Sequence, residues 1–250
     1  MKFALVEGER REAKPGLSGK CPVYGHAMIA KCGEHRVHHW AHRANYTCDL
    51  WWENETEWHR NWKNQFPEEC QEIIRHSDSG EKHIADVKTE SGVILEFQYS
   101  FLRRDEREAR ELFYQKMVWV VHGLRRKRDL AQFFASLDAG TVVYRKPAIV
   151  SVLWKEGALL RDWGASRVPV YFDFETPILW RLNPSGPHGR SYLSPVQKTE
   201  FLRIHLKGLP FEEEYSAAVE RVGHLIQQAP QPLSGFQRYM ARRQRTRRRF

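Results

Sequence analysis

The stretch His83–Ser100, HIADVKTESGVILEFQYS, constrains the fold more than any other part of this chain. Read with a period of two, it predicts a β-hairpin with strands over 83–89 and 93–100 and a short turn that contains glycine. Side chains alternate between the two faces of a strand. If the hairpin places Asp86 and Glu96 on the same face, two carboxylates meet at one surface of the sheet.

Two like charges held close together resist ionising at the same time, so this arrangement is costly without a cation between them. The carboxylate oxygens of Asp86 and Glu96 are ligands that suit Mg²⁺ or Mn²⁺. The alternative is a solvent-facing strand with ordinary surface charges. The spacing by itself leaves both interpretations open.

The segments on either side of the hairpin predict further elements. Before it, apolar residues recur every four positions and predict a helix over 53–66, with Glu57 beside the apolar stripe. The other predicted elements are a strand over 69–76, a charged helix over 102–115 and a short buried strand over 117–122. The expected order is therefore helix, three strands, helix and strand.

This order and these residues resemble the PD-(D/E)xK nuclease superfamily and, within it, the competence protein CoiA-like family. The matching residues are ETEWHRNWK in the first helix, HIADV and VILEFQYS in the hairpin, and YQKMVWVVHG around the last strand. The resemblance covers roughly residues 20–125. It implies an α/β fold with a restriction-endonuclease-like core of order αβββαβ.

The resemblance also implies a role for each candidate residue. Asp86 and Glu96 would ligate Mg²⁺ or Mn²⁺, helped by a backbone carbonyl near Phe97, and Glu57 would bind a metal water or a second metal. Gln98 stands where the superfamily pattern usually has lysine, and it can hydrogen-bond a water or a phosphate oxygen but carries no charge. The metal would lower the pKa of a bound water and stabilise negative charge in the transition state.

Residues 21–48 are rich in cysteine and histidine, which is the composition of a zinc site. In the CoiA-like family this segment often carries a Cys-x-x-Cys pair and then a His-Phe-Ala-His-like element; here only the second remains, as HWAH. The alternative is a small β-rich cap whose histidines line the nuclease cleft or pack beside Trp40. A zinc site with four ligands would take them from Cys21, Cys32, either His39 or His42, and Cys48.

The charge of the chain is concentrated at one end. The net charge is +9, and residues 236–250 hold seven arginines and no acid, which leaves +2 for residues 1–235. Such a tail predicts a phosphate-binding arm that adds salt-dependent affinity for DNA without sequence specificity; the alternative is a disordered, solubilising end. Its candidate contacts are Arg242, Arg243, Arg245, Arg247, Arg248 and Arg249.

A second set of candidate nucleic-acid contacts lies on the helix predicted over 102–115. Arg103, Arg107 and Arg110 share one stripe of this helix, and Tyr114 closes it near the site. A cationic stripe of this kind predicts a clamp on the phosphate backbone. The alternative is that the acidic residues between the arginines pair with them along the helix.

Beyond residue 125 the pattern predicts an extension that is first β and then α. After a short helix over 130–137, strands are predicted over 141–144, 148–154, 158–162, 168–174 and 176–182. Ser194 followed by Pro195 predicts the N-terminus of a helix, and 211–228 predicts another. The chain thus divides into a Cys/His-rich cap, a nuclease core, a β-then-α extension and an Arg-rich tail, over residues 1–50, 51–125, 126–235 and 236–250.

Other classes of protein are disfavoured. No stretch approaches the roughly 18 apolar residues that a membrane span needs, and the first residues lack the pattern of a signal peptide. Four cysteines in 250 residues do not suggest a disulfide scaffold, so a cytoplasmic protein without a membrane partner is expected.

Three functions remain. The first is a Mg²⁺- or Mn²⁺-dependent nuclease that hydrolyses single- or double-stranded DNA, in DNA uptake and recombination or in defence against foreign DNA. The second is a nucleic-acid-binding protein with a degenerate nuclease site that acts with a protein partner, which Gln98 and the altered cysteine pair favour. The third is a zinc-stabilised interaction module whose arginine tail binds RNA or protein. The first is the expectation that the active-site residues support.

Overall fold

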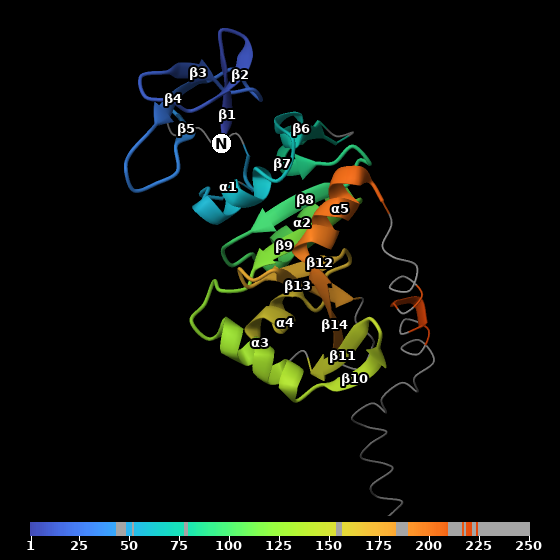
Figure 1. Ribbon diagram of the computed structural model, residues 1–250. Coiled ribbons are helices and arrows are strands. Elements are labelled where there is room, and N and C mark those ends of the chain that lie inside the picture. The colour runs from blue at the N-terminus through green and yellow to red at the C-terminus, as the bar shows by residue number, and fades with distance from the viewer. Residues whose placement is uncertain are drawn as a thin grey trace, which may run out of the picture.

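The chain folds into a mixed α/β structure with two sheets, seen in the computed structural model (Figure 1). The structure describes residues 1–43, 49–51, 53–77, 80–153, 157–183 and 190–209, together with residues 217, 219–221 and 224. Within these residues, no helix is long and apolar enough to cross a membrane.

The larger sheet contains nine strands. They are β6 (Gln71–His76), β7 (Lys82–Lys88), β8 (Ile94–Gln98), β9 (Met117–His122), β10 (Thr141–Arg145), β11 (Ala148–Leu153), β12 (Val170–Asp173), β13 (Ile178–Asn183) and β14 (Arg190–Gln197). Their spatial order is β10-β11-β14-β13-β12-β9-β8-β7-β6. The neighbours β8, β9 and β12 run parallel, and the strands on either side of them pair antiparallel.

Helices cover both faces of this sheet. They are α1 (Glu57–Lys63), α2 (Arg104–Tyr114), α3 (Asp129–Asp138), α4 (Ala158–Trp163) and α5 (Lys198–Lys207), with a short 3₁₀ turn at Glu68–Cys70. In β9, Trp119 and Val121 belong to the core under α2, α3 and α4, whereas Val118 and Val120 belong to the core under α1 and α5. A strand buried on both faces reads as a continuous apolar run, so the prediction of a buried strand over 117–122 is confirmed.

The helix predicted over 53–66 is confirmed but is shorter at both ends, over Glu57–Lys63. It begins at Glu57 because Thr56 caps it: the Thr56 hydroxyl accepts the backbone N–H of His59, and the His59 ring accepts the backbone N–H of Thr56. This reciprocal pair satisfies two donors at the start of the helix. Glu53 therefore lies outside the helix, where its carboxylate accepts the N–H of Ser100 just beyond β8.

Two elements of the extension differ from prediction. The strand expected over 158–162 is the helix α4, in which Leu159, Leu160 and Trp163 are all buried, a helical spacing that a short apolar run conceals. Ser194 and Pro195 lie inside β14, and the helix begins only at Lys198.

Pairing within the sheet explains why Pro195 does not start a helix. Strand β14 pairs with β13 from Tyr192 to Gln197, opposite Asn183 to Ile178. On its other side β14 pairs with β11 only as far as Leu193, so the missing N–H of Pro195 costs no hydrogen bond to β11. The long-range ladder therefore outweighs the local capping pattern.

The extension continues the sheet of the preceding segment. Strand β12 pairs parallel with β9, with Val170 opposite Trp119, and antiparallel with β13. Pro169 directly precedes β12, which lies in the interior of the sheet. Residues on both sides of position 125 therefore share one hydrophobic core.

The N-terminal segment folds as the expected β cap. Its five strands, in the order β2-β1-β3-β4-β5, are β1 (Phe3–Val6), β2 (Glu9–Glu12), β3 (Ser18–Lys20), β4 (Ala27–Lys31) and β5 (His39–His42). Met28 and Trp40 fill its small core. The cap lies beside α1 and β6 (Figure 1), where Arg10 Nη2 donates to the carbonyl of Gln71 at 2.7 Å.

Candidate active site

The ladder between β7 and β8 is interrupted at Asp86. The regular pairing reaches Val87 opposite Leu95, so the next positions, Asp86 and Glu96, lie opposite each other. There the side chains replace the ladder: the N–H of Asp86 donates to Glu96 Oε1 at 3.2 Å, and the N–H of Phe97 donates to Asp86 Oδ2 at 2.9 Å. The structure thus brings together the two carboxylates that the alternation pattern predicts.

A third carboxylate, Glu72, extends this row. The pairs that flank Asp86 in the β6–β7 ladder leave Glu72 opposite it, with a φ of +48°, a left-handed conformation that is uncommon outside glycine. The Glu72 carboxylate accepts the backbone N–H groups of Lys2 at 2.6 Å and Phe3 at 3.0 Å from the cap. Sequence analysis missed Glu72, because only the register of β6 against β7 reveals it.

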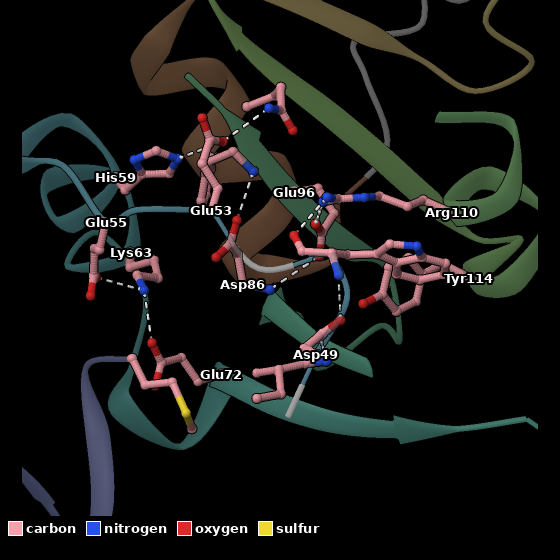
Figure 2. A pocket seen from close by; sticks show the side chains of 15 residues that line it. Asp49, Glu53, Glu55, His59, Lys63, Glu72, Asp86, Glu96, Arg110 and Tyr114 are labelled. Atoms are coloured by element: carbon pink, nitrogen blue, oxygen red, sulfur yellow. Dashed lines mark hydrogen bonds and ion pairs between the residues drawn. The ribbon is translucent and has the colours of Figure 1, made fainter. Parts of the chain in front are cut away.

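These side chains line a cavity of about 70 Å³ between α1, α2 and the sheet, shown in Figure 2. We call it the carboxylate cavity. Its acidic lining residues are Asp49, Glu53, Glu55, Glu72, Asp86 and Glu96. The basic side chains that line it are Lys63, Arg110 and His59, so negative groups outnumber positive ones.

Gln98, at the end of β8, is held by Glu53. Its Nε2 donates to Glu53 Oε2 at 2.9 Å and to the carbonyl of Ser100 at 3.3 Å. Glu53 also accepts the N–H of Ser100 at 2.7 Å, and its Oε2 lies 3.5 Å from His59 Nε2. Both donors of the Gln98 amide are therefore in use, which leaves its carbonyl oxygen, an acceptor, as the atom that can orient a water.

Lys63 bridges two buried carboxylates across the cavity. Its Nζ lies 2.6 Å from Glu55 Oε1 and 2.9 Å from Glu72 Oε1. Although burial favours the neutral amine, the charges of Glu72 and Glu55 raise the pKa of Lys63. Burial likewise opposes ionisation of Glu55, yet Lys63 and Arg60 hold the pKa of Glu55 below its usual range. Lys63 and Glu55 are therefore both charged, and each finds its partner within this network.

Arg110 contacts the other end of the carboxylate row. Its Nη1 donates to Glu96 Oε2 at 3.2 Å, and its Nη2 donates to Glu106 and to the carbonyl of Trp51. Tyr114, one turn further along α2, is buried and also lines the cavity (Figure 2). Both residues therefore shape the site from inside the protein.

The two central carboxylates are not fully compensated. Burial and the charge of Asp86 raise the pKa of Glu96 to about 8, although Arg110 partly offsets them. Burial also raises the pKa of Asp86, with the charge of Lys63 acting in the opposite direction. A carboxyl pair whose pKa values are raised in this way is stabilised by an additional cation.

The donor set fits a hard divalent cation. Asp86 and Glu96 offer carboxylate oxygens in a cavity with excess negative charge. Within the part of the chain that the structure describes, no three or more His, Cys, Asp or Glu side chains already form a group that could hold a metal ion. One or two carboxylates and several waters are, however, the usual ligands of Mg²⁺, so the pair is sufficient for this ion.

Glu57 does not face the carboxylate cavity. It is exposed at the start of α1 and lines two grooves on the outside of that helix. Glu57 lies two residues from His59, which puts their side chains about 200° apart around the helix. His59 and Lys63 face the cavity, so the carboxylates that reach it from this region are Glu53 and Glu55 rather than the predicted Glu57.

The arginine stripe of α2 is not an exposed clamp. Arg107 is buried, where its Nε lies 3.3 Å from Glu111 Oε1 and its Nη1 donates to the carbonyl of Asp162. Arg110 is buried against Glu96, as described above. Arg103 alone of the three is exposed, and it pairs with Asp105 at 2.6 Å. The prediction of a shared phosphate-binding stripe is therefore wrong for Arg107 and Arg110.

The described candidates for a zinc site do not come together. Cys21 is buried and its Sγ accepts the N–H of Val23, while Cys32 packs against the cap core. His39 Nδ1 lies 2.9 Å from the carbonyl of Val37, and the ring of His42 meets that of His26 edge to face. Neither His39 nor His42 lines the carboxylate cavity.

Seven predicted ligands or contacts lie outside the described residues: Cys48, Arg242, Arg243, Arg245, Arg247, Arg248 and Arg249. Comparison with known proteins adds no relative, since no family model, curated protein or solved structure matches the chain significantly.

Proposed function

We propose that this protein is a metal-dependent nuclease that hydrolyses DNA phosphodiester bonds with Mg²⁺ or Mn²⁺, in DNA uptake and recombination or in defence against foreign DNA. The observation that carries the proposal is the position of Asp86 opposite Glu96 in a buried cavity with excess negative charge. In an ordinary surface pair, the carboxylates would not replace the hydrogen bonds of the ladder. Asp86 and Glu96 do so by accepting backbone N–H groups across the two strands.

The arrangement of elements supports a PD-(D/E)xK core of the CoiA-like kind. Helix α1, strands β6, β7 and β8, helix α2 and strand β9 follow one another in the chain, and β9 pairs parallel with β8. Asp86 lies on the second of these strands, and Glu96 and Gln98 on the third. This is the distribution that the resemblance implies for Asp86, Glu96 and Gln98, whereas Glu57, expected at the site from the first helix, lies outside the carboxylate cavity.

In the proposed reaction Asp86 and Glu96 would hold the metal ion. The ion would supply an acidified water and a positive charge near the phosphate. Gln98, fixed by Glu53, would accept a hydrogen bond from the attacking water through its carbonyl oxygen and so orient it. Arg110 holds the carboxylate of Glu96, and Lys63 holds that of Glu72. Neither of these basic side chains would have to move during the reaction.

The net charge of the chain supports a polyanionic substrate. Of the +9, seven charges lie in residues 236–250, and such a segment would add affinity for the phosphate backbone without sequence specificity. Removing these residues should weaken DNA binding, flatten its salt dependence and spare cleavage of short substrates. Binding that keeps its salt dependence after the deletion would show that other residues carry the backbone contacts.

The function is tested by incubating supercoiled, linear and single-stranded DNA with the protein in Mg²⁺, Mn²⁺ or EDTA. We expect metal-dependent cutting that is lost in Asp86→Asn and in Glu96→Gln. Both variants retain the size of the native side chain, which preserves the packing around the cavity. If the two variants cut as well as the native protein does, the nuclease assignment is wrong.

A second candidate is a nucleic-acid-binding protein with a degenerate site that acts with a protein partner. The observation in its favour is that Gln98, which carries no charge, stands where a nuclease of this type usually has lysine, and that both donors of its amide are already bonded. This candidate predicts salt-sensitive DNA binding without cutting in either metal.

A further inference from the structure

A second depression lies on the opposite side of α1 from the carboxylate cavity. It has a volume of about 690 Å³ and runs between α1 and α5, and we call it the α1–α5 groove. Tyr99, directly after β8, and Asp173, at the end of β12, form part of its wall. Because β8 and β12 run in the same direction on either side of β9, both residues lie at the carboxyl edge of the parallel strands, where open α/β sheets bind ligands.

The aromatic wall of the groove is held rigidly by a buried carboxylate. Asp173 Oδ2 accepts the indole N–H of Trp58 at 3.0 Å and that of Trp62 at 2.9 Å, and its Oδ1 lies 2.9 Å from Lys198 Nζ. Both indoles bond their polar atoms inward and line the groove, with only 9% and 6% of Trp58 and Trp62 exposed, so the half-buried Tyr99 is the more accessible ring. Tyr99 is backed by His122, whose ring stacks on it at 4.5 Å.

Two amides accompany this aromatic wall. Asn61, on α1, and Gln65, in the turn that follows α1, are exposed and line the groove. A flat ring with hydrogen-bonding edges is matched by aromatic faces together with amide groups. The volume is within the range of sites that take a small organic group.

The charges in the groove exclude a phosphate. The charged side chains that line it are Glu57, Glu175, Asp173 and Lys198, and the lysine is paired with Asp173. Among the described residues, the exposed carboxylates of Glu57 and of Glu175, which accepts a hydrogen bond from His122 at 2.8 Å, remain to repel a phosphodiester. The part of a nucleic acid that suits these surroundings is an uncharged base.

We propose that the α1–α5 groove binds one unpaired base of the substrate strand, next to the phosphate in the carboxylate cavity. The two sites adjoin at Tyr99, whose ring lies 5.9 Å from that of His59 in the cavity and whose neighbour is Gln98. A base can enter the groove only when it is not stacked in a duplex. The inference rests on the proposed function in taking the ligand to be nucleic acid, and it makes single-stranded or frayed DNA the substrate class.

The test is equilibrium binding of short fluorescent single-stranded DNA in EDTA, so that cutting plays no part. One oligonucleotide has all its bases, and a series carries one abasic site at each position in turn. We expect a loss of affinity of roughly five- to a hundredfold when the abasic site falls at one particular position, the range found for stacking of one base on aromatic side chains. A blunt duplex of the same sequence should bind more weakly than the single strand.

Variants assign this loss to the groove. Tyr99→Leu removes the aromatic ring, and Asn61→Ala combined with Gln65→Ala removes two exposed amides without disturbing the core. Either change should shrink the penalty of the abasic site. The matched control is Asn54→Ala, an exposed amide that lines a different groove, on the cap side of α1, where the penalty should persist.

The outcomes separate this inference from the nuclease assignment. An abasic penalty that is absent, or that is the same in every variant, overturns the base-binding groove even if the protein cuts DNA. A penalty that depends on Tyr99 supports the groove even if no metal elicits cutting, in which case only the nuclease assignment is lost.

Discussion

Glu53 holds Gln98 in position. A substitution of Glu53 therefore tests the proposed active site without changing Gln98 itself. Glu53→Gln would replace a charge-assisted hydrogen bond to the Gln98 amide with a weaker one. We expect cleavage to fall by roughly ten- to a hundredfold, the usual effect of changing a residue that orients an active-site group. Single-turnover rates on one DNA substrate would measure it.

Glu57→Gln is the comparison for this variant, because Glu57 is also an acid near the start of α1 but faces away from the cavity. Its loss of rate should be much smaller. If Glu57→Gln proves the more damaging of the two, the side of α1 that faces the substrate has been misassigned.

The charge of Lys63 compensates two buried carboxylates, so the stability of the fold depends on it. Lys63→Met keeps the length of the side chain but leaves Glu55 and Glu72 without the ammonium that lies between them. We expect the free energy of unfolding to fall by roughly 3–5 kcal/mol, the typical effect of removing one partner from a buried ion pair. Urea unfolding followed by tryptophan fluorescence would record the change.

Lys207→Met serves as the control, because Lys207 is an exposed residue of the last turn of α5. It should alter stability by less than about 0.5 kcal/mol. Equal effects of the two substitutions would mean that Lys63 is not the internal counter-charge described here.

Among the helices, α2 shows that arginines spaced like a DNA-binding stripe can instead lie on the buried side of a helix. Its arginine spacing is that of a cationic stripe, yet Arg107 and Arg110 lie on the side that packs against the sheet and α4. Acidic partners within the helix, such as Glu111, make their burial tolerable. The helix therefore supports the site from within.

This difference predicts opposite results for two arginines of α2. Arg107→Ala should lower the free energy of unfolding by roughly 3–5 kcal/mol, because Glu111 loses its buried partner. Arg103→Ala should change it by less than about 0.5 kcal/mol, since Arg103 is exposed. Thermal and urea unfolding of both variants provide the measurement.

The salt dependence of DNA binding also tests whether Arg107 is a buried structural residue or a phosphate contact. Arg107→Ala should leave the slope of affinity against salt concentration unchanged, because a buried guanidinium releases no counterion from DNA. A slope that falls by about one unit in the folded Arg107 variant would restore Arg107 as a phosphate contact.

At the scale of the whole molecule, the carboxylate cavity links stability to pH and to divalent cations. Folding raises the pKa of Glu96 from 4.5 to about 8. The folded state is therefore favoured fully below about pH 4.5, and this contribution is lost as the pH rises toward 8, an effect on the order of a few kcal/mol. In EDTA the unfolding temperature should fall over this interval.

Glu96→Gln should flatten that pH dependence, because the amide does not titrate. At pH 8, Mg²⁺ or Mn²⁺ should raise the unfolding temperature of the native protein and leave that of Asp86→Asn unchanged. If the cations stabilise both proteins equally, they bind outside the carboxylate cavity.

Features that depend on local geometry could be predicted from the residues alone. Alternation along 83–100 predicted which residues share a face, although the meeting of Asp86 with Glu96 also required the register of the hairpin, and the unbroken apolar run of β9 predicted its burial on both faces. Both follow from the period of the backbone, which neighbouring residues share whatever the rest of the chain does.

Tertiary structure alone decided which other charges meet these two acids. Glu72 enters the row through the register of β6 against β7, and Glu53 through hydrogen bonds to the end of β8. Burial likewise removed Arg107 from the surface, and strand pairing overrode the helix start at Pro195. Register and burial depend on the free energy of contacts between segments that are far apart in the sequence. The periodicity of a short stretch of sequence does not reveal those contacts.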